Sequence, residues 1–310
     1  MSTIFEQPDD ARIKPSVSGE ISSANSLDWR KVDWRTVAPF VFAAALLAAL
    51  AWPMLSWWGY EFTKPESYYA HAPVIPFFVA LMLWYRRDTI AAVPKKPNYF
   101  ALAVLLPSLL LLIFAIKSQM QAVMSTSFLL ILWSSVWLVF GGALVRAMAI
   151  PLAFLAFMAP LPGPVLNDAT LRIQMMSTVL ANKILHLLTF STQLDGNVIQ
   201  MENFSLFVDV PCSGFKTLLA LLTFSGAFAY LVDGSPIKRF GIFLLSLPLS
   251  LAINSVRIAL IGVVGECISA DAAHTFHDWS GMITLVLGFI VLFSLAKVLG
   301  CRKFAGWPIF

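Results

Sequence analysis

Charged residues are scarce in this chain, and their scarcity excludes most soluble folds. Asp, Glu, Lys and Arg together make up 12% of the 310 residues, whereas hydrophobic residues make up 59% and the mean hydropathy is +0.79. A soluble domain carries about 25% charged residues, and it has too little interior to bury so much apolar surface. The sequence therefore predicts a protein whose solvent is a lipid bilayer.

Cysteine and histidine are also few. The odd number and the spacing of Cys212, Cys267 and Cys301 match neither a disulfide framework nor a metal-ligand motif. None of the four histidines has a partner at the spacing that zinc peptidases use, with an acidic residue between them. We therefore expect no metal and no other cofactor.

The excess of positive charge is small. The chain has 21 Lys and Arg against 17 Asp and Glu, a net charge of +4. No basic helix carries interleaved aromatic side chains, so nucleic acid is not expected as a partner. In a membrane protein such an excess sets orientation instead, because lysine and arginine accumulate in cytoplasmic loops.

Long apolar runs are what the chain has in abundance. A helix of about 20 apolar residues crosses the hydrocarbon layer. Runs of about this length cover residues 38–59, 70–86, 99–117, 122–141, 144–161, 213–232, 240–263 and 278–298. The pattern predicts an all-α polytopic membrane protein with about eight transmembrane helices, in which residues 37–310 form a single integral-membrane domain.

Three segments depart from this pattern. Residues 1–36 are polar and aperiodic, so we expect a disordered cytoplasmic tail without a cleavable signal peptide. Residues 165–190 have helical periodicity but are too polar for a lipid-facing span, which favours an interfacial or re-entrant helix. Residues 194–211 carry a turn signal and two β-prone runs, which predict a short extracytoplasmic β-hairpin.

The distribution of basic residues has a consequence for three reactive side chains. Most lysines and arginines fall on one side of the alternating spans, which predicts that both termini are cytoplasmic. With this orientation Cys212 opens one helix at the outer face, and Arg257 lies about two turns before the outer end of the next. His277 stands at the outer start of the last helix. Residues that can perform nucleophilic chemistry are therefore predicted to meet at one membrane face.

Each of these residues also has a purely structural interpretation. A cysteine in a membrane helix is often a small packing residue, and Arg257 and His277 could serve as interfacial side chains. However, Pro211 and Gly214 predict a turn that places Cys212 near a helix N-terminus, where the partial positive charge favours the thiolate. An arginine within a span is costly and is usually paired or functional.

Several neighbours are candidate support or substrate-binding residues. Ser213 is a candidate helix cap, and Asn254 lies one turn before Arg257 on the same helix face. His274 competes with His277 for its role because it lies only three residues earlier. The candidate support or substrate-binding residues are Ser213, Gly214, Asn254, His71 and His274.

The reactive residues lie in short motifs that occur in a fixed order. The motifs are Cys-Ser-Gly at 212–214, Asn-x-x-Arg at 254–257 and His-x-x-x-Gly at 277–281. They resemble the three active-site blocks of the exosortase/archaeosortase family of membrane transpeptidases. Further similar blocks are Tyr-Tyr-Ala-His-Ala-Pro-Val-Ile-Pro with Leu-Trp-Tyr-Arg-Arg, Phe-Met-Ala-Pro-Leu-Pro-Gly at 157–163 and Asp-Gly-Asn-Val-Ile at 195–199. The resemblance covers roughly residues 60 to 300.

The resemblance implies specific roles. Cys212 would be the nucleophile, Arg257 the transition-state stabiliser and His277 the general acid/base. The substrates would be membrane-anchored proteins with a C-terminal PEP-CTERM-like signal, which are cleaved through a Cys thioester and transferred to an acceptor. The implied location is a prokaryotic cytoplasmic (inner) membrane, with the active site on the extracytoplasmic face. Pro211 departs from the family pattern, because many relatives have a small residue before the cysteine, and this leaves the subfamily open.

Two other functions stay open at this point. A transporter or lipid-handling permease would explain the polar segment 165–190 and the prolines Pro73 and Pro76 at the start of the second span. We find no inverted repeats that would favour it. A membrane thiol protease that hydrolyses its own intermediate would use the same catalytic residues, and only its products would distinguish it from a transpeptidase.

Overall fold

The computed structural model describes residues 34–64 and 67–308. The chain forms two compact units, Met1–Ala49 and Leu50–Phe310. The predicted tail at residues 1–36 lies outside the described residues, except for its final positions. These positions begin an apolar helix, α1 (Trp34–Leu50), which makes up the described part of the first unit apart from its last residue, Leu50, where the second unit begins.

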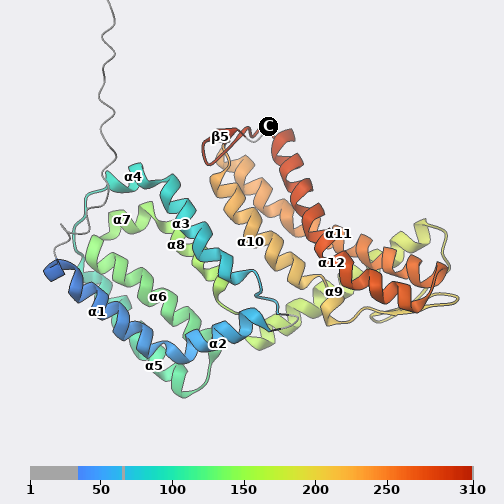
Figure 1. The fold of residues 1–310 in the computed structure, drawn as a ribbon, viewed down its shortest axis with the longest axis horizontal. Helices are drawn as coiled ribbons and strands as arrows, with labels where there is room; N and C mark the ends of the chain where they lie inside the picture. The colour runs from blue at the N-terminus through green and yellow to red at the C-terminus, as the bar shows by residue number, and fades with distance from the viewer. Residues whose placement is uncertain (1–33, 65–66, 309–310) are drawn as a thin grey trace, which may run out of the picture. The chain divides into compact units, whose positions relative to one another are not determined.

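The second unit is mostly helical (Figure 1). Its α-helices are α2 (Trp52–Thr63), α3 (Ile75–Tyr85), α4 (Arg87–Ala91), α5 (Leu102–Lys117), α6 (Gln121–Phe140), α7 (Gly142–Ala147), α8 (Ala149–Phe154), α9 (Gly163–Leu187), α10 (Phe215–Leu231), α11 (Pro236–Cys267) and α12 (Ala270–Val298). Short 3₁₀ helices are η2 (Ala72–Val74), η3 (Tyr99–Ala101), η4 (Leu155–Met158) and η5 (Val210–Cys212). This content confirms the prediction of an all-α polytopic membrane protein.

Fewer helices are long enough to cross a bilayer than the eight predicted spans. Among the described residues, four helices meet the length and composition of a span: Tyr99–Lys117, Gln121–Phe140, Pro236–Cys267 and Ala270–Val298. The number rises to six if each of two bent helix pairs is one span. One such pair is Ala149–Met158 with Gly163–Leu187, bent by 84°.

The remaining predicted spans are helical but short or broken. The predicted span 70–86 becomes the short apolar helix Ala72–Tyr85, and 213–232 becomes Phe215–Leu231. Prolines lie at the start of Ala72–Tyr85, and the left-handed Gly214 precedes Phe215–Leu231. Both helices therefore begin later in the chain than the predicted spans. The predicted span 144–161 divides into the short helices α7, α8 and η4.

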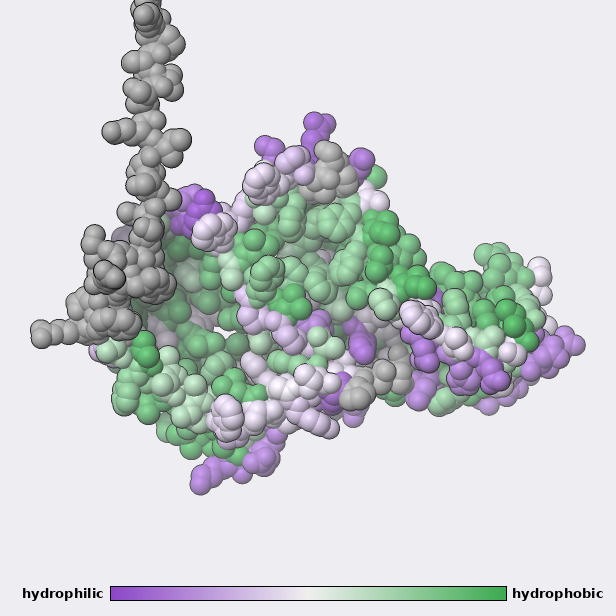
Figure 2. All heavy atoms as spheres, in the orientation of Figure 1, coloured by the Kyte–Doolittle hydropathy of each residue, from purple (hydrophilic) through white to green (hydrophobic). Residues whose placement is uncertain are grey.

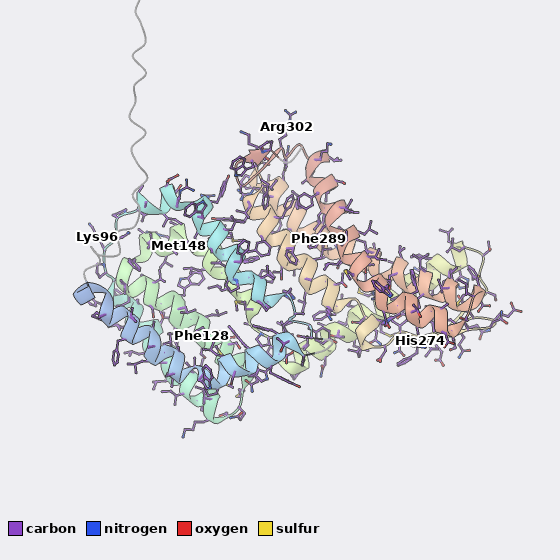
Figure 3. The ribbon with its side chains drawn as sticks, viewed as in Figure 1. Lys96, Phe128, Met148, His274, Phe289 and Arg302 are labelled. Carbon is purple, nitrogen blue, oxygen red and sulfur yellow. The ribbon has the colours of Figure 1, made fainter. Side chains whose placement is uncertain are left out.

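Helix α11 is the central element of the helix group α9 to α12. It packs against α9, α10 and α12, and α10 also contacts α3 (Figure 1). A helix of 32 residues is about 48 Å long, which exceeds the roughly 30 Å of a hydrocarbon core. One end of α11 and its neighbour α12 therefore extends beyond the part that can lie in lipid. Figure 3 places His274 and Arg302 at opposite ends of this pair.

The basic end of this helix group lies at the start of α11 and the end of α12. It contains Arg86, Lys238, Arg239, Lys297 and Arg302. A C-terminal hairpin of β4 (Lys303–Phe304) and β5 (Trp307–Pro308) closes it, because Asp233 accepts the backbone amides of residues 302 and 303 at 2.7 and 2.9 Å. Hydrophobic surface covers much of the helices, and hydrophilic residues gather at the edges of this view, at the top and again at the lower right (Figure 2).

A small antiparallel sheet follows α9. Its strands β1 (Gln193–Asp195), β2 (Val198–Gln200) and β3 (Ser205–Phe207) pair in the order β1-β2-β3. The predicted hairpin is confirmed as the pair β2–β3, and β1 adds a third strand. Ile199, Leu206 and Val208 pack against buried residues of α9 and α11. The sheet therefore covers part of these two helices and delivers the chain to Cys212.

Candidate active site

Cys212 ends the short helix η5, directly before α10. Asp209 begins η5, and its carboxylate accepts the amide of Val210 at 2.7 Å. The Ser213 hydroxyl accepts the amide of Phe215 at 3.2 Å, in the first turn of α10. The half-buried thiol of Cys212 therefore lies next to a helix N-terminus, where the local dipole favours a thiolate.

The turn between η5 and α10 fits closely against α11. Gly214 has φ +80°, and a Cβ atom there would lie 2.4 Å from Cγ of Asn254. The Asn254 amide donates to the Cys212 carbonyl at 3.1 Å, and its side chain is buried. Gly214 is therefore required both for the left-handed backbone and for the space that Asn254 fills.

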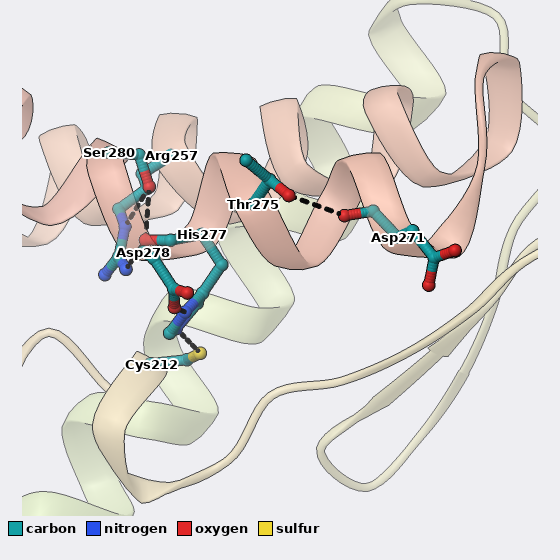
Figure 4. A network of polar contacts seen from close by, with 7 residues as sticks. All are labelled: Cys212, Arg257, Asp271, Thr275, His277, Asp278 and Ser280. Carbon is teal, nitrogen blue, oxygen red and sulfur yellow. Dashed lines mark hydrogen bonds and ion pairs between the residues drawn. The ribbon is translucent and has the colours of Figure 1, made fainter.

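The thiol of Cys212 contacts the imidazole of His277 on α12. Sγ and Nε2 are 2.8 Å apart, and the other ring nitrogen lies 3.1 Å from a carboxylate oxygen of Asp278 (Figure 4). The Asp278 side chain is 79% exposed, so water weakens its effect on the imidazole. A thiol, an imidazole and a carboxylate in this order resemble the nucleophile, base and orienting group of covalent catalysis.

Arg257 completes the cluster from α11. It is buried, and its Nε donates to Oγ of Ser280 at 2.8 Å while Nη2 donates to the His277 carbonyl at 3.0 Å (Figure 4). Ser280 also donates to the same carbonyl at 3.0 Å. The guanidinium is thus tied to the backbone of the residue whose imidazole contacts the thiol.

A cavity of about 700 Å³ opens beside this cluster. Polar side chains of Arg257, His277 and Asp278 lie on its wall, together with Lys216 and His71. The other wall residues are mainly apolar and come mostly from η2, α10 and α12: Val74, Ala220, Phe224, Met282 and Leu285. The volume is within the usual range of ligand sites, about 300–1,000 Å³. The cavity therefore offers a polar reacting end and an apolar continuation.

His71 faces this cavity from the loop between α2 and η2. Burial lowers the pKa of His71 to about 4, so the ring is neutral at neutral pH. The adjoining Tyr69 fixes the loop, because its hydroxyl accepts the amide of Leu161 at 2.8 Å. His71 can therefore offer a neutral hydrogen-bonding group to a ligand, without adding charge.

The structure separates the two neighbouring histidines of α12. His274 is exposed and is not on the cavity wall, whereas His277 contacts the thiol. Sequence reasoning missed Ser280, although its position one turn after His277 places it on nearly the same helix face. It also missed Asp278 and Lys216 as polar residues of the cavity wall.

Together these observations define a polytopic membrane protein with a thiol–imidazole pair and a buried guanidinium at one end of its helices. The family model described as transmembrane exosortase (Exosortase_EpsH) matches residues 57–294, which is more than half of the chain. The chain therefore belongs to the transmembrane exosortase family. No curated protein and no solved structure shows a significant match to the chain.

Proposed function

We propose that this exosortase-family protein is a membrane-embedded cysteine transpeptidase with Cys212 as its nucleophile. The observation that carries the proposal is the 2.8 Å separation between Sγ of Cys212 and Nε2 of His277, beside a cavity that Arg257 also lines. A nucleophile and its base within hydrogen-bond reach are the basic requirement for acyl transfer through a covalent intermediate.

In the proposed reaction, His277 Nε2 accepts the thiol proton and Cys212 attacks a peptide carbonyl of the substrate. Arg257 stabilises the oxyanion of the tetrahedral intermediate, since a fixed cation in a site shielded from water acts where charge develops. His277 then donates the proton to the leaving amine, and an acyl thioester of Cys212 remains. A second nucleophile attacks this thioester and restores the thiol.

The position of the cluster along the helices supports an extracytoplasmic site. Arg257 lies 19 residues after Lys238 on α11, and His277 lies 20 residues before Lys297 on α12. At 1.5 Å per residue each separation is about 30 Å, the thickness of a hydrocarbon core. If the basic end is cytoplasmic, the cluster is at the opposite interface of a prokaryotic inner membrane.

The proposed substrates are membrane-anchored proteins with a C-terminal PEP-CTERM-like sorting signal. Such a signal places its scissile segment just outside a hydrophobic span, at the depth of this cluster. The apolar wall of η2, α10 and α12 suits the approach of the substrate from lipid. Water as acceptor would make the same site a thiol protease, and product analysis distinguishes the two.

Co-expression with a sorting-signal protein tests the proposal. We expect the wild type to shorten the substrate and Cys212→Ala to leave it full-length, with both enzymes inserted equally. Cys267→Ala is the matched control, because this exposed cysteine ends α11 away from the cavity wall. Shortening of the substrate by Cys212→Ala would contradict a cysteine mechanism. A wild type that is inserted but leaves the substrate full-length would favour the permease alternative.

A further inference from the structure

A second cleft lies at the basic end of the helices, between α3, α8, α10 and α11. Its volume is about 480 Å³, and its walls are largely aromatic, with Phe154, Phe157 and Phe243 among them. Gly226 allows these walls to approach each other, since a Cβ there would lie 3.2 Å from Phe154 and 3.4 Å from Phe243. The proposed transpeptidase reaction makes no use of this cleft.

Two arginines line this cleft. Arg86 follows α3 and Arg239 lies on α11, and both lie near Tyr230. The guanidinium carbons of Arg86 and Arg239 are each 5.7 Å from the centroid of the buried Tyr230 ring. Arg239 is fixed by the C-terminal carbonyls of α10, because Nε donates to Ala229 O at 2.7 Å and Nη2 donates to Tyr230 O. Two positive charges are thus held around one aromatic ring.

No carboxylate in the described ranges forms an ion pair with either arginine. The ion pairs found there involve Arg87 and Arg172, together with Lys64 and His277. The nearby Asp233 is engaged by backbone amides of the C-terminal hairpin. The cleft therefore combines aromatic walls with two cations that pair with none of the described carboxylates, which is complementary to an anionic head group on an apolar chain.

We propose that this cleft binds an anionic phospholipid of the leaflet at the basic end. The phosphodiester contacts Arg86 and Arg239, and an acyl chain lies along the phenylalanines. Basic pockets between transmembrane helices are a recognised chemistry for anionic lipid head groups on the cytoplasmic side. The proposal does not rest on the peptidase activity, since the cleft and the catalytic cavity share no wall residue.

Native mass spectrometry of the purified full-length chain in neutral detergent tests the proposal. The probes are dioleoyl-phosphatidylglycerol and dioleoyl-phosphatidylcholine, titrated separately. We expect one phosphatidylglycerol to bind about tenfold more tightly than phosphatidylcholine, the effect of one charge-assisted hydrogen bond or more. Equal binding of the two lipids to the wild type would overturn the proposal without any variant.

Neighbouring arginines provide a matched pair of variants. Arg86→Gln should lose about tenfold in phosphatidylglycerol affinity. Arg87→Gln removes the same charge one residue later, but this guanidinium stacks 4.7 Å from the Trp84 ring and does not line the cleft. Arg87→Gln should therefore bind like the wild type. Equal losses in both variants would indicate diffuse attraction and overturn a defined site.

Two further arms identify the occupant. Glycerophosphate, which carries the head-group charge without acyl chains, should fail to displace the bound lipid at equal concentration. Displacement by it would show a site for soluble phosphate instead. A photoreactive phenylalanine analogue replacing Phe240 on the cleft wall should crosslink to lipid. Crosslinking to a second protein chain would overturn the lipid assignment.

Discussion

At the scale of single residues, the hydroxyl of Ser280 joins the two helices that carry Arg257 and His277. It accepts from Arg257 on α11 and donates to the His277 carbonyl on α12, and Arg257 donates to that same carbonyl. The orientation of the guanidinium therefore depends on the residue that carries the imidazole. Ser280 touches neither the thiol nor the imidazole ring, so we assign it a positioning role.

Ser280→Ala should slow substrate processing about tenfold, because Arg257 keeps its charge but loses the Ser280 hydroxyl as a fixed acceptor. Ser280→Thr retains the hydroxyl and should recover most of the rate, which a purely steric role would not produce. Initial rates of processing by equal amounts of inserted enzyme measure both. Ser294→Ala is the control, since this exposed serine on the same helix bonds only the Ile290 carbonyl at 2.8 Å. A rate for Ser280→Ala equal to that of the control would contradict the assignment.

The residue types of the cluster could be predicted, but their supporting contacts could not. Cysteine, arginine and histidine are unusual enough at one membrane face to be singled out from the sequence. A serine in a membrane helix most often bonds its own backbone, as Ser255 and Ser294 do here, so Ser280 carried no distinctive signal. His274 and His277 lie on similar helix faces. They are distinguished only by the level of α12 that Cys212 contacts, which is that of His277.

At the scale of elements, the position of the Cys212 thiol depends on the junction between η5 and α10. A strand, a 3₁₀ turn and a helix start meet within a few residues, and Gly214 supplies the left-handed step. Asn254 then fills the space beside that glycine and holds the Cys212 carbonyl. A side chain at position 214 would displace Asn254 and, with it, the thiol.

Gly214→Ala should therefore lower thermal stability strongly and abolish processing. The control Gly196→Ala has a similar backbone requirement, with φ +59°, but nothing lies within 4 Å of its Cβ position. It should cost only about 1–2 kcal/mol, the strain of a left-handed alanine. Melting curves in detergent compare the two. Equal losses of stability would show that contact with Asn254 is unimportant.

Element positions were predicted more closely than element lengths. Each predicted span coincides with helix, but hydropathy does not register the left-handed turn before α10 or the breaks between α7, α8 and η4. The polar segment 165–190 forms α9, whose buried polar residues include Gln174 and Ser177 facing the turn that carries Cys212. Strand β1 was missed because Gln193 and Leu194 give only a very short β-prone run.

At the scale of the whole molecule, helix length sets the distance between the cluster and the basic end, and the charge bias predicts that the basic end is cytoplasmic. The basic end and the Cys212 cluster are separated by about one hydrocarbon thickness along two independent helices. Beyond the cluster, α9, the small sheet, the C-terminal end of α11 and the N-terminal end of α12 share a buried core. The long final helices therefore support a structured region outside the spanning part.

Cys267 is a natural reporter of this orientation, because it is exposed and ends α11, at the end opposite to the basic end. In a variant with Cys212→Ala and Cys301→Ala, a membrane-impermeant maleimide should label it in intact spheroplasts. Thr89→Cys, added after removal of all three native cysteines, places an exposed thiol near the basic end and should react only after permeabilisation. Labelling in the reverse pattern would place the cluster on the cytoplasmic side.

The most direct measurement of the central claim is detection of the acyl-enzyme itself. Wild-type enzyme is incubated with a sorting-signal substrate without an added acceptor, and the products are analysed by peptide mass spectrometry. We predict a substrate fragment attached to the Cys212 peptide, released by hydroxylamine as expected of a thioester and absent from Cys212→Ala. The mechanism would be contradicted if the wild type cleaved the substrate while its Cys212 stayed unmodified, and if Cys212→Ala cleaved the substrate as well.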